Sequence, residues 1–412
     1  MKKVMGLILI CMCFLCTGCF DYIELTDRAL VSSISIDYKE GLYDVSFEIV
    51  KPKSEKDSSS ESKVLIISGT GSSISEAFSN TAIKTEKEAY FAHLSVMIIS
   101  EDIANSHINV ISDYLLRAAI FHNNFYIVIA KDYDAKEIIE ASSPSEPIVG
   151  KAISGIISNN KYFQSVTQKM ELEDFISLVE DKGKNSYLPA ISIEEDDRLF
   201  VAGLGMFSEG KLQVIADEDL TSVMTILNNK MGNHILQFPC EENEYAQSTI
   251  ADASDNSDTK SEDKKSEEKD NQKPSEEEST PIDESDNKNQ KTVKYTTVNL
   301  YKIEKADFEF NSQNEVIFKS KISASLIQNA CNYDLTKEET YQKLEEKFQE
   351  VLIKEIETFV NLTKEYNSDV LGIRKKYLNK YRAYPEDWRQ IVFKYKIEIK
   401  LNKNGLIYEV NK

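Results

Sequence analysis

Residues 241–291 divide the sequence in two, because this block contains almost nothing that could enter a hydrophobic core. Apart from Ile250 and Ile282 it has no Ile, Leu, Val or Phe, and its 17 acidic and 7 basic residues give it a net charge of −10. Such a segment cannot bury enough apolar surface to offset the conformational entropy lost on folding. We therefore expect a disordered acidic insertion, either a tolerated solvated loop or a spacer that contacts a partner.

The N-terminus has the pattern of an export signal. Lys2 and Lys3 precede a 12-residue apolar stretch, which is too short for a membrane-spanning helix of about 20 residues. We therefore interpret residues 1–18 as a signal peptide. Small residues lead to Cys19, and Thr17-Gly18-Cys19 resembles the lipobox of bacterial lipoproteins, in which the cysteine is lipidated and becomes the mature N-terminus. Cys19 is the predicted lipid-attachment site; the alternative is an ordinary cleaved signal with an incidental cysteine.

The remaining cysteines leave one question open. Three of the six cysteines lie inside the predicted signal peptide and Cys19 would be blocked by lipid, which leaves Cys240 and Cys331. In an oxidising compartment these two could form a disulfide, but their distance in space does not follow from the sequence. Two separate thiols are the alternative.

Composition and motifs argue against several classes of function. The formal net charge of −20 is unlike that of a nucleic-acid-binding protein, which usually presents a basic face. The four histidines share no metal-binding spacing, and Gly69-Thr-Gly71 lacks the further residues of a dinucleotide or phosphate loop. We therefore expect no enzymatic activity, no metal and no cofactor.

A basic cluster near the C-terminus has two interpretations. Residues 374–376 are Arg-Lys-Lys, and Lys380, Arg382 and Arg389 follow them. These cations could contact anionic lipid headgroups, each contributing about 1 kcal/mol near a membrane surface. The alternative is an ordinary solvated helix face.

The part of the chain before the acidic block alternates strands and helices. Apolar and polar residues alternate over 29–38 and 43–50, which predicts two half-buried strands joined by a turn at Lys39-Glu40-Gly41. Ser73 as N-cap, with Glu76 three residues later, forms a capping-box pattern that predicts a helix over 72–89. Further elements are expected as strands at 64–68, 94–100, 125–130, 188–194, 199–207 and 212–216, and as helices at 101–119, 148–158, 172–181 and 220–230.

The part after the block predicts an antiparallel sheet covered by one long helix. The helix is expected over 336–366, with Thr336 and Glu339 as a capping box, because seven residues repeat at intervals of three or four: Tyr341, Leu344, Phe348, Leu352, Ile356, Phe359 and Thr363. Strands are expected at 292–303, 307–310, 316–327, 391–401 and 406–410. Together the two parts predict a multidomain, mixed α/β protein of the α+β class.

We divide the chain accordingly. Residues 1–18 are the signal peptide, 19–197 an N-terminal α/β domain, 198–240 the start of the C-terminal region with a β-hairpin and a helix, 241–291 the insertion, and 292–412 a C-terminal α+β domain.

Several stretches in a fixed order resemble the C subunit of spore germinant receptors, the Ger(x)C lipoprotein family. The mature N-terminus Cys19-Phe20-Asp21 is similar to the family's Gly-Cys-Trp-Asp start, with Phe20 in the place of the Trp. The other similar stretches are His93–Val96, Leu115-Leu116-Arg117, residues 204–212, Asp369-Val-Leu-Gly372, Tyr384-Pro385 with Trp388, and 403–407.

The resemblance implies a non-enzymatic, lipid-anchored subunit of a nutrient germinant receptor, required for spore germination. It also implies a place on the outer face of the spore inner membrane, in a complex with A-type and B-type membrane subunits, and no nucleic-acid partner. The alternative function is an extracytoplasmic solute-binding lipoprotein of a transporter, although the long insertion is unusual for that class.

Overall fold

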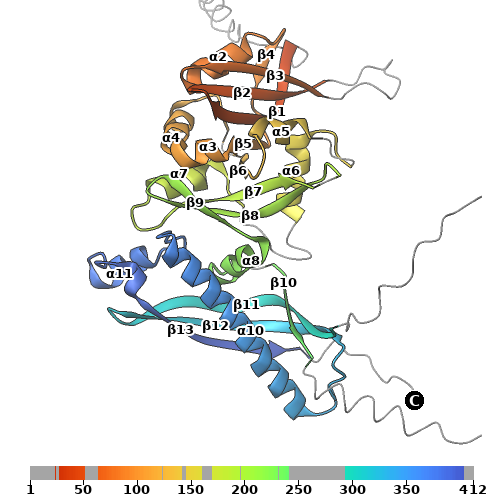
Figure 1. The fold of residues 1–412 in the computed structure, drawn as a ribbon, viewed down its shortest axis with the longest axis vertical. Helices are drawn as coiled ribbons and strands as arrows, with labels where there is room; N and C mark the ends of the chain where they lie inside the picture. Colours follow the sequence, from red (N-terminus) through yellow and green to blue (C-terminus); the bar gives the residue numbers. More distant parts are fainter. Residues whose placement is uncertain are drawn as a thin grey trace, which may run out of the picture.

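The computed structural model describes residues 24, 27–51, 64–122, 124–141, 145–159, 169–194, 196–230, 232–240 and 293–402. The predicted signal peptide, Cys19, the acidic insertion 241–291 and the predicted strand 406–410 lie outside the described residues. The fold is α+β, with a large and a small sheet that follow each other along the long axis of the molecule (Figure 1).

The large sheet begins with an antiparallel meander. β1 (Arg28–Lys39) pairs with β2 (Leu42–Val50), and β2 pairs with β3 (Val64–Gly71). At the turn, Glu40 and Gly41 have φ angles of 53° and 85°, the left-handed pair that a tight two-residue hairpin requires. The two predicted strands and their turn are confirmed, but the expectation that the strands are half-buried is wrong, because both faces are buried over Val31–Asp37 and Val45–Ile49.

The middle of the large sheet is parallel and buried on both faces. β5 (Val96–Ser100) lies between β1 and β6 (Tyr126–Ala130), and all five of its residues are buried. Val96 and Ile98 join the core under helices α5 and α6, whereas Met97 and Ile99 join the core under α3 and α4. This alternation explains the continuous apolar run of β5. The helices are α3 (Glu101–Ser106), α4 (Ile108–Arg117), α5 (Ala135–Glu140) and α6 (Val149–Asn159).

The large sheet ends in a second antiparallel meander. The strands are β7 (Tyr187–Ile193), β8 (Leu199–Ser208) and β9 (Lys211–Ala216). In β8, Gly203 has a φ of 132°, and a Cβ atom there would lie 1.9 Å from the carbonyl oxygen of Ala216. Gly203 therefore permits the close approach of two strands.

The small sheet has the order β10-β11-β12-β13. Its strands are β10 (His234–Pro239), β11 (Tyr295–Ser312), β12 (Glu315–Asn329) and β13 (Val392–Leu401). The first two pairs are antiparallel, but β13 runs parallel to β12, so the expectation of a purely antiparallel sheet is wrong in its last pair. The physical reason is the connection: the chain crosses over through two helices before β13, and such a crossover returns a strand in the same direction.

One long helix covers the small sheet. α10 (Glu338–Glu365) buries all seven residues of the predicted stripe, and Figure 1 shows it crossing β11–β13 diagonally. Its start differs from the predicted capping box, because Lys337 is the N-cap and makes no side-chain capping bond. Thr336 instead donates its Oγ1 and backbone N–H to Asp334. The next helix is α11 (Ile373–Tyr381).

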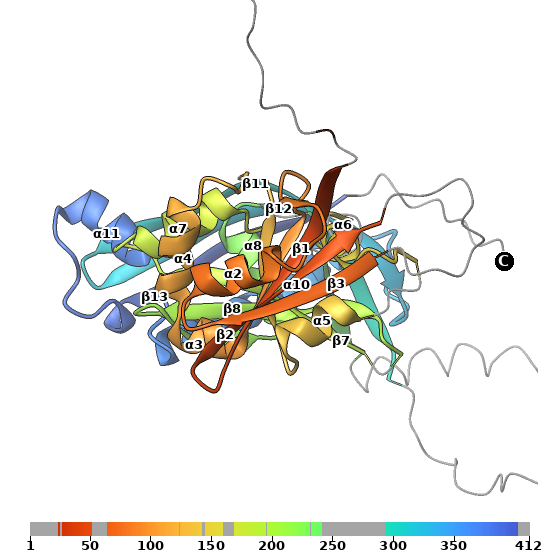
Figure 2. The ribbon, with the colours of Figure 1, turned by 90° about the horizontal axis from the view of Figure 1, so that it is seen from above.

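Helix α8 (Glu218–Leu227) lies between the two sheets. Every residue from Thr221 to Leu227 is buried, and the helix packs on β8, β11 and α10. In the view from above, α8 lies within the outline of the molecule (Figure 2). One continuous apolar core therefore extends from the large sheet through α8 into the small sheet.

Other element boundaries also differ from the sequence predictions. The helix expected over 72–89 is α2 (Ile74–Ala82), and β4 (Glu88–Tyr90) follows it. Ser73 accepts a hydrogen bond from the Glu76 N–H, as predicted, but the Glu76 carboxylate accepts from Ser72 and does not complete the capping box with Ser73. The helix expected over 101–119 is broken at His107 into α3 and α4. The two strands expected over 292–310 are one strand, β11, and the short elements α5 and β10 were not predicted.

Cys240 and Cys331 form a disulfide, which answers the question that the sequence left open. Their Cα atoms are 5.3 Å apart, within the usual range for such a bond. Cys240 follows β10 and Cys331 follows β12, so the bond closes one end of the small sheet.

Two buried carboxylates hold helices against the large sheet. Asp37 of β1 accepts hydrogen bonds from the N–H groups of Ala135 and Lys136 at the start of α5. Glu48 of β2 accepts from Val149 and Gly150 at the start of α6. Burial raises the pKa of Asp37 to about 6 and also raises the pKa of Glu48, although the helix N–H groups favour the charged forms.

This pKa shift predicts how Asp37 affects stability with pH. Between pH 4 and 6 the folded protein holds a proton on Asp37 that the unfolded chain has lost, so the free energy of unfolding falls as the pH rises through this range. We expect wild type to lose up to about 3 kcal/mol relative to D37N between pH 4 and pH 7. Urea unfolding of both proteins at several pH values measures this. A constant difference between them would contradict it.

Candidate functional site

The two parts of the molecule are joined by a polar network that we call the joint. It consists of two segments. The first is the loop between α7 (Leu172–Glu180) and β7, and the second is residues 367–375, which include the connection from α10 to α11 and the first residues of α11. The backbone N–H of Asn185 donates to the carbonyl oxygen of Asp369 (2.9 Å), and the N–H of Asp369 donates to Asn185 Oδ1 (2.8 Å). The N–H of Lys375 donates to the Gly183 carbonyl oxygen (3.0 Å). These hydrogen bonds join the loop after α7 to the segment 367–375.

Asp369 is the buried centre of the joint. Its side chain is fully buried, and its two oxygens accept hydrogen bonds from the N–H groups of Ile373 (2.8 Å) and Arg374 (2.7 Å) at the start of α11. The Arg374 guanidinium lies 3.4 Å from the same carboxylate and donates to Asn185 Oδ1 at 2.6 Å. Burial raises the pKa of Asp369, while the N–H groups and Arg374 act in the opposite direction.

The hairpin β8–β9 contributes a second set of bonds to the joint. Ser208 Oγ donates to the carbonyl oxygen of Asn367 (2.9 Å), and Ser368 Oγ donates to the carbonyl oxygen of Phe207 (2.6 Å). Asn367 has a φ of 49°, the left-handed conformation that an Asn tolerates at the end of a helix. The large sheet therefore holds the connection between α10 and α11 from two directions.

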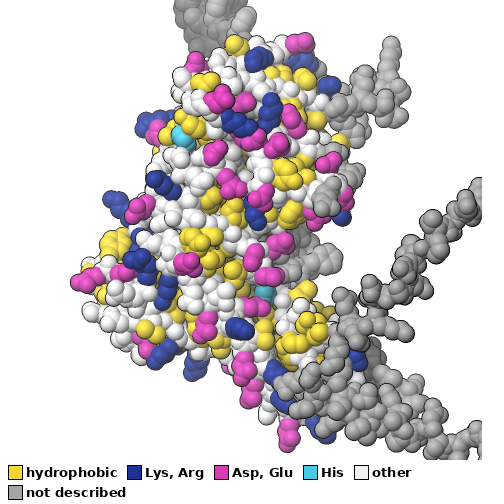
Figure 3. Space-filling model, viewed as in Figure 1, with side chains coloured by type: hydrophobic (Ala, Val, Ile, Leu, Met, Phe, Trp, Pro, Cys, Tyr) yellow, Lys and Arg dark blue, Asp and Glu magenta, His cyan; other side chains and the backbone are white. Residues whose placement is uncertain are grey.

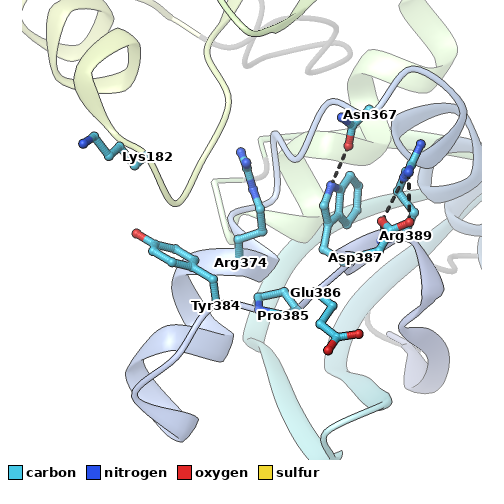
Figure 4. A pocket seen from close by; sticks show the side chains of 9 residues that line it. Lys182, Asn367, Arg374, Tyr384, Pro385, Glu386, Asp387 and Arg389 are labelled. Carbon is cyan, nitrogen blue, oxygen red and sulfur yellow. Dashed lines mark hydrogen bonds and ion pairs between the residues drawn. The ribbon is translucent and has the colours of Figure 1, made fainter.

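An open polar pocket of about 450 Å³ lies beside the joint (Figure 4). Lys182 lines it from the large-sheet side, and Arg374 and the segment 384–389 line it from the other side. The indole of Trp388 is buried and donates from Nε1 to Asn367 Oδ1 (3.0 Å). Asp387 and Arg389 form an ion pair at 2.8 Å, whereas Tyr384 is half exposed.

The pocket is lined by charged and polar side chains and by the indole of Trp388. Its side chains offer cations, carboxylates, a phenol and amide groups, but no nucleophile hydrogen-bonded to a base. In the part of the chain that the structure describes, no three His, Cys, Asp or Glu side chains gather to hold a metal ion. Among the described helices, none combines the length and apolarity needed to cross a bilayer.

Two residues of the basic cluster, Arg374 and Lys375, lie within the joint, and several of the cluster's cations have acidic partners. Arg374 faces Asp369, and Arg389 pairs with Asp387. Lys375 lies 2.5 Å from Asp181 and Lys376 lies 3.9 Å from Asp307.

The joint brings together stretches that are far apart in the sequence. The segments 204–212, 369–372 and 384–388, which carried part of the family resemblance, meet there. The loop with Asp181, Gly183 and Asn185 was not identified from the sequence, because a short polar loop has no signal of its own. Cys19, the predicted lipid-attachment site, lies outside the described residues.

Two known families match the chain in succession. The family described as "Spore germination protein N-terminal domain" matches residues 21–193, and "Spore germination B3/ GerAC like, C-terminal" matches residues 202–405. The two matches together cover both sheets and the joint.

Individual relatives are more distant. "Spore germination protein KC" of Bacillus subtilis (strain 168) is 22% identical over 205 residues, which are 48% of this chain and 50% of that protein. "Putative spore germination protein YfkR" of the same organism is 23% identical over 254 residues, 58% of this chain and 64% of that protein. The matches thus span between half and two thirds of these relatives. The crystal structure of the GerBC protein is 16% identical, with a TM-score of 0.46 over 89% of this chain and 96% of that chain.

Two aspartates test the role of the joint, since each faces an arginine in a different setting. In D369N the Arg374 guanidinium loses a fully buried charged partner, and we expect the free energy of unfolding to fall by about 3 kcal/mol or more. In D387N the lost partner belongs to a more exposed pair, and we expect a change of about 1 kcal/mol or less. Urea unfolding compares the two variants with wild type. Equal losses would show that the joint is no more than an ordinary surface contact.

Proposed function

Because the chain belongs to the GerAC-like family of spore germination proteins, we propose that it is a non-enzymatic subunit of a nutrient germinant receptor, required for spore germination. The observation that carries this proposal is the succession of the two family matches, at 21–193 and 202–405. The pocket at the joint supports it, because its side chains suit binding rather than bond-breaking chemistry. The transporter alternative gains no support from the comparisons.

The proposed location is the outer face of the spore inner membrane, with a diacylglyceryl group on Cys19. Two acyl chains hold a protein stably at a membrane, whereas one chain gives only marginal binding. The short apolar stretch before Cys19 supports export of the chain. The disulfide between Cys240 and Cys331 also supports it, because such bonds persist in oxidising compartments.

The proposed partners are the A-type and B-type membrane subunits of the receptor. A body held at the membrane by lipid, with no evident catalytic arrangement among its described residues, would act through contacts with such subunits. The joint would then keep the two sheets in a fixed relation, so that a partner bound to one part could be sensed by the other.

The proposed lipid anchor is tested by replacing Cys19, whose sulfur atom would carry the lipid. C19A removes the sulfur to which lipid attaches, so we expect the protein to leave the membrane fraction and spores to germinate poorly in nutrients, as in a deletion strain. Germination with a non-nutrient trigger, and the yield of spores, should stay normal. C19S also lacks the thiol and, as a second variant, is expected to give the same result. A normal nutrient response in the deletion strain would refute the proposed function.

The disulfide tests export independently of lipid. In intact cells treated with a membrane-permeable alkylating reagent, Cys240 and Cys331 are expected to remain unlabelled until a reductant is added. Mass spectrometry of the two peptides measures this. Full labelling without reductant would place the chain in a reducing compartment.

A further inference from the structure

A second pocket, of about 280 Å³, lies where the chain enters the large sheet. We call it the entry pocket. Its floor is formed by apolar side chains at the starts and ends of β1, β2 and β3, among them Ile49, Val50 and Ile67. The segment between α2 and β4 forms its rim. It lies at one end of the long axis, and the small sheet lies at the other end (Figure 1).

The entry pocket is rich in positive charge although the chain as a whole is acidic. Four cations line it, Arg28, Lys51, Lys84 and Lys87, against one carboxylate, Glu86. Lys84 Nζ donates to the carbonyl oxygen of Ser68 (2.6 Å), and the Arg28 guanidinium lies 4.2 Å from the centre of the Tyr90 ring. Both partners are neutral, so they do not compensate the positive charges of Lys84 and Arg28. Arg28 Nε is buried and donates no hydrogen bond to any of the described residues.

Apolar side chains stand beside these cations at the surface. Leu65 of the pocket wall is 45% exposed, and Ile83, next to Lys84, is 78% exposed. Figure 3 shows hydrophobic, basic and acidic side chains intermingled at the end of the molecule that carries β2–β4. A surface with both properties suits a partner that is both anionic and apolar, which is the chemistry of a phospholipid at the bilayer interface.

The position of the entry pocket in the chain favours the same partner. Arg28 is nine residues after Cys19, so at most about 30 Å of extended chain separates it from the proposed lipid. A lipid on Cys19 would therefore keep this end of the molecule near the headgroups, and the pocket would meet them at high effective concentration.

We propose that the entry pocket is a contact surface for anionic phospholipid headgroups, with Lys51, Lys84 and Lys87 at the headgroup level and Leu65 and Ile83 against the interface. This inference rests on the proposed anchor at Cys19 and adds an orientation to it. The contact makes the molecule stand on the β1–β4 end, with the small sheet and the joint projecting away from the bilayer.

The test uses the mature chain with C19A, so that no lipid contributes to binding. We expect it to co-sediment at low salt with vesicles of phosphatidylcholine and phosphatidylglycerol, and not with phosphatidylcholine alone. K51E/K84E/K87E should lower the partition coefficient by at least about tenfold, since each cation near the surface is worth several-fold in affinity. The matched control K302E/K305E/K396E makes the same change of net charge on the small sheet, and should change it by less than about twofold.

Each outcome decides between the possibilities. Failure of the wild-type mature chain to bind anionic vesicles, or an equal loss in the two triple variants, overturns the proposal. Binding of glycerol 1-phosphate in a calorimeter without binding of vesicles would identify a site for a small free anion instead. K51Q/K84Q/K87Q, together with thermal unfolding, separates loss of contact from loss of folding. Because these measurements use unlipidated protein, a failure of the Cys19 anchor in cells is recognised separately by membrane fractionation.

Discussion

Helix α8 is buried from Thr221 to Leu227, and this buried stretch joins the two sheets into one molecule. The side chains of Val223, Met224, Ile226 and Leu227 are buried, between β8 on one side and α10 and β11 on the other. Burial of a large apolar side chain contributes about 1.5–3 kcal/mol, more than a typical hydrogen bond at about 1 kcal/mol. The apolar contacts of α8 therefore contribute strongly to the attraction between the two parts, and the large and small sheets share a core.

The polar joint adds direction to this attraction. Apolar contacts tolerate small rotations, whereas the bonds between Asn185, Asp369 and Arg374 require one relative placement of the two loops. Because Asp369 is fully buried, its carboxylate is stable there only while the N–H groups of α11 and the Arg374 guanidinium surround it. The apolar contacts of α8 thus stabilise the association of the two sheets, and the hydrogen bonds of the joint determine their relative orientation.

This construction suits the proposed role at a membrane. The end with β1–β4 is the one nearest to Cys19 in the chain, and the entry pocket there carries cations beside exposed apolar side chains. The opposite end, with the small sheet closed by the Cys240–Cys331 disulfide, would be presented to other subunits. A rigid body between the two ends would transmit a displacement better than two domains on a flexible linker.

Much of the local structure was predictable from the sequence alone. The stripe from Tyr341 to Thr363 follows from which side chains must leave water, because burial repeats with the geometry of the helix. The alternation over β1 and β2 predicted strands correctly, although both faces of these strands are buried. Only the tertiary structure decided the parallel pairing of β13, the Cys240–Cys331 bond, the partners of Asp369 and the gathering of cations at the entry pocket. These features depend on distances between residues far apart in the chain, and no local period or composition encodes such a distance.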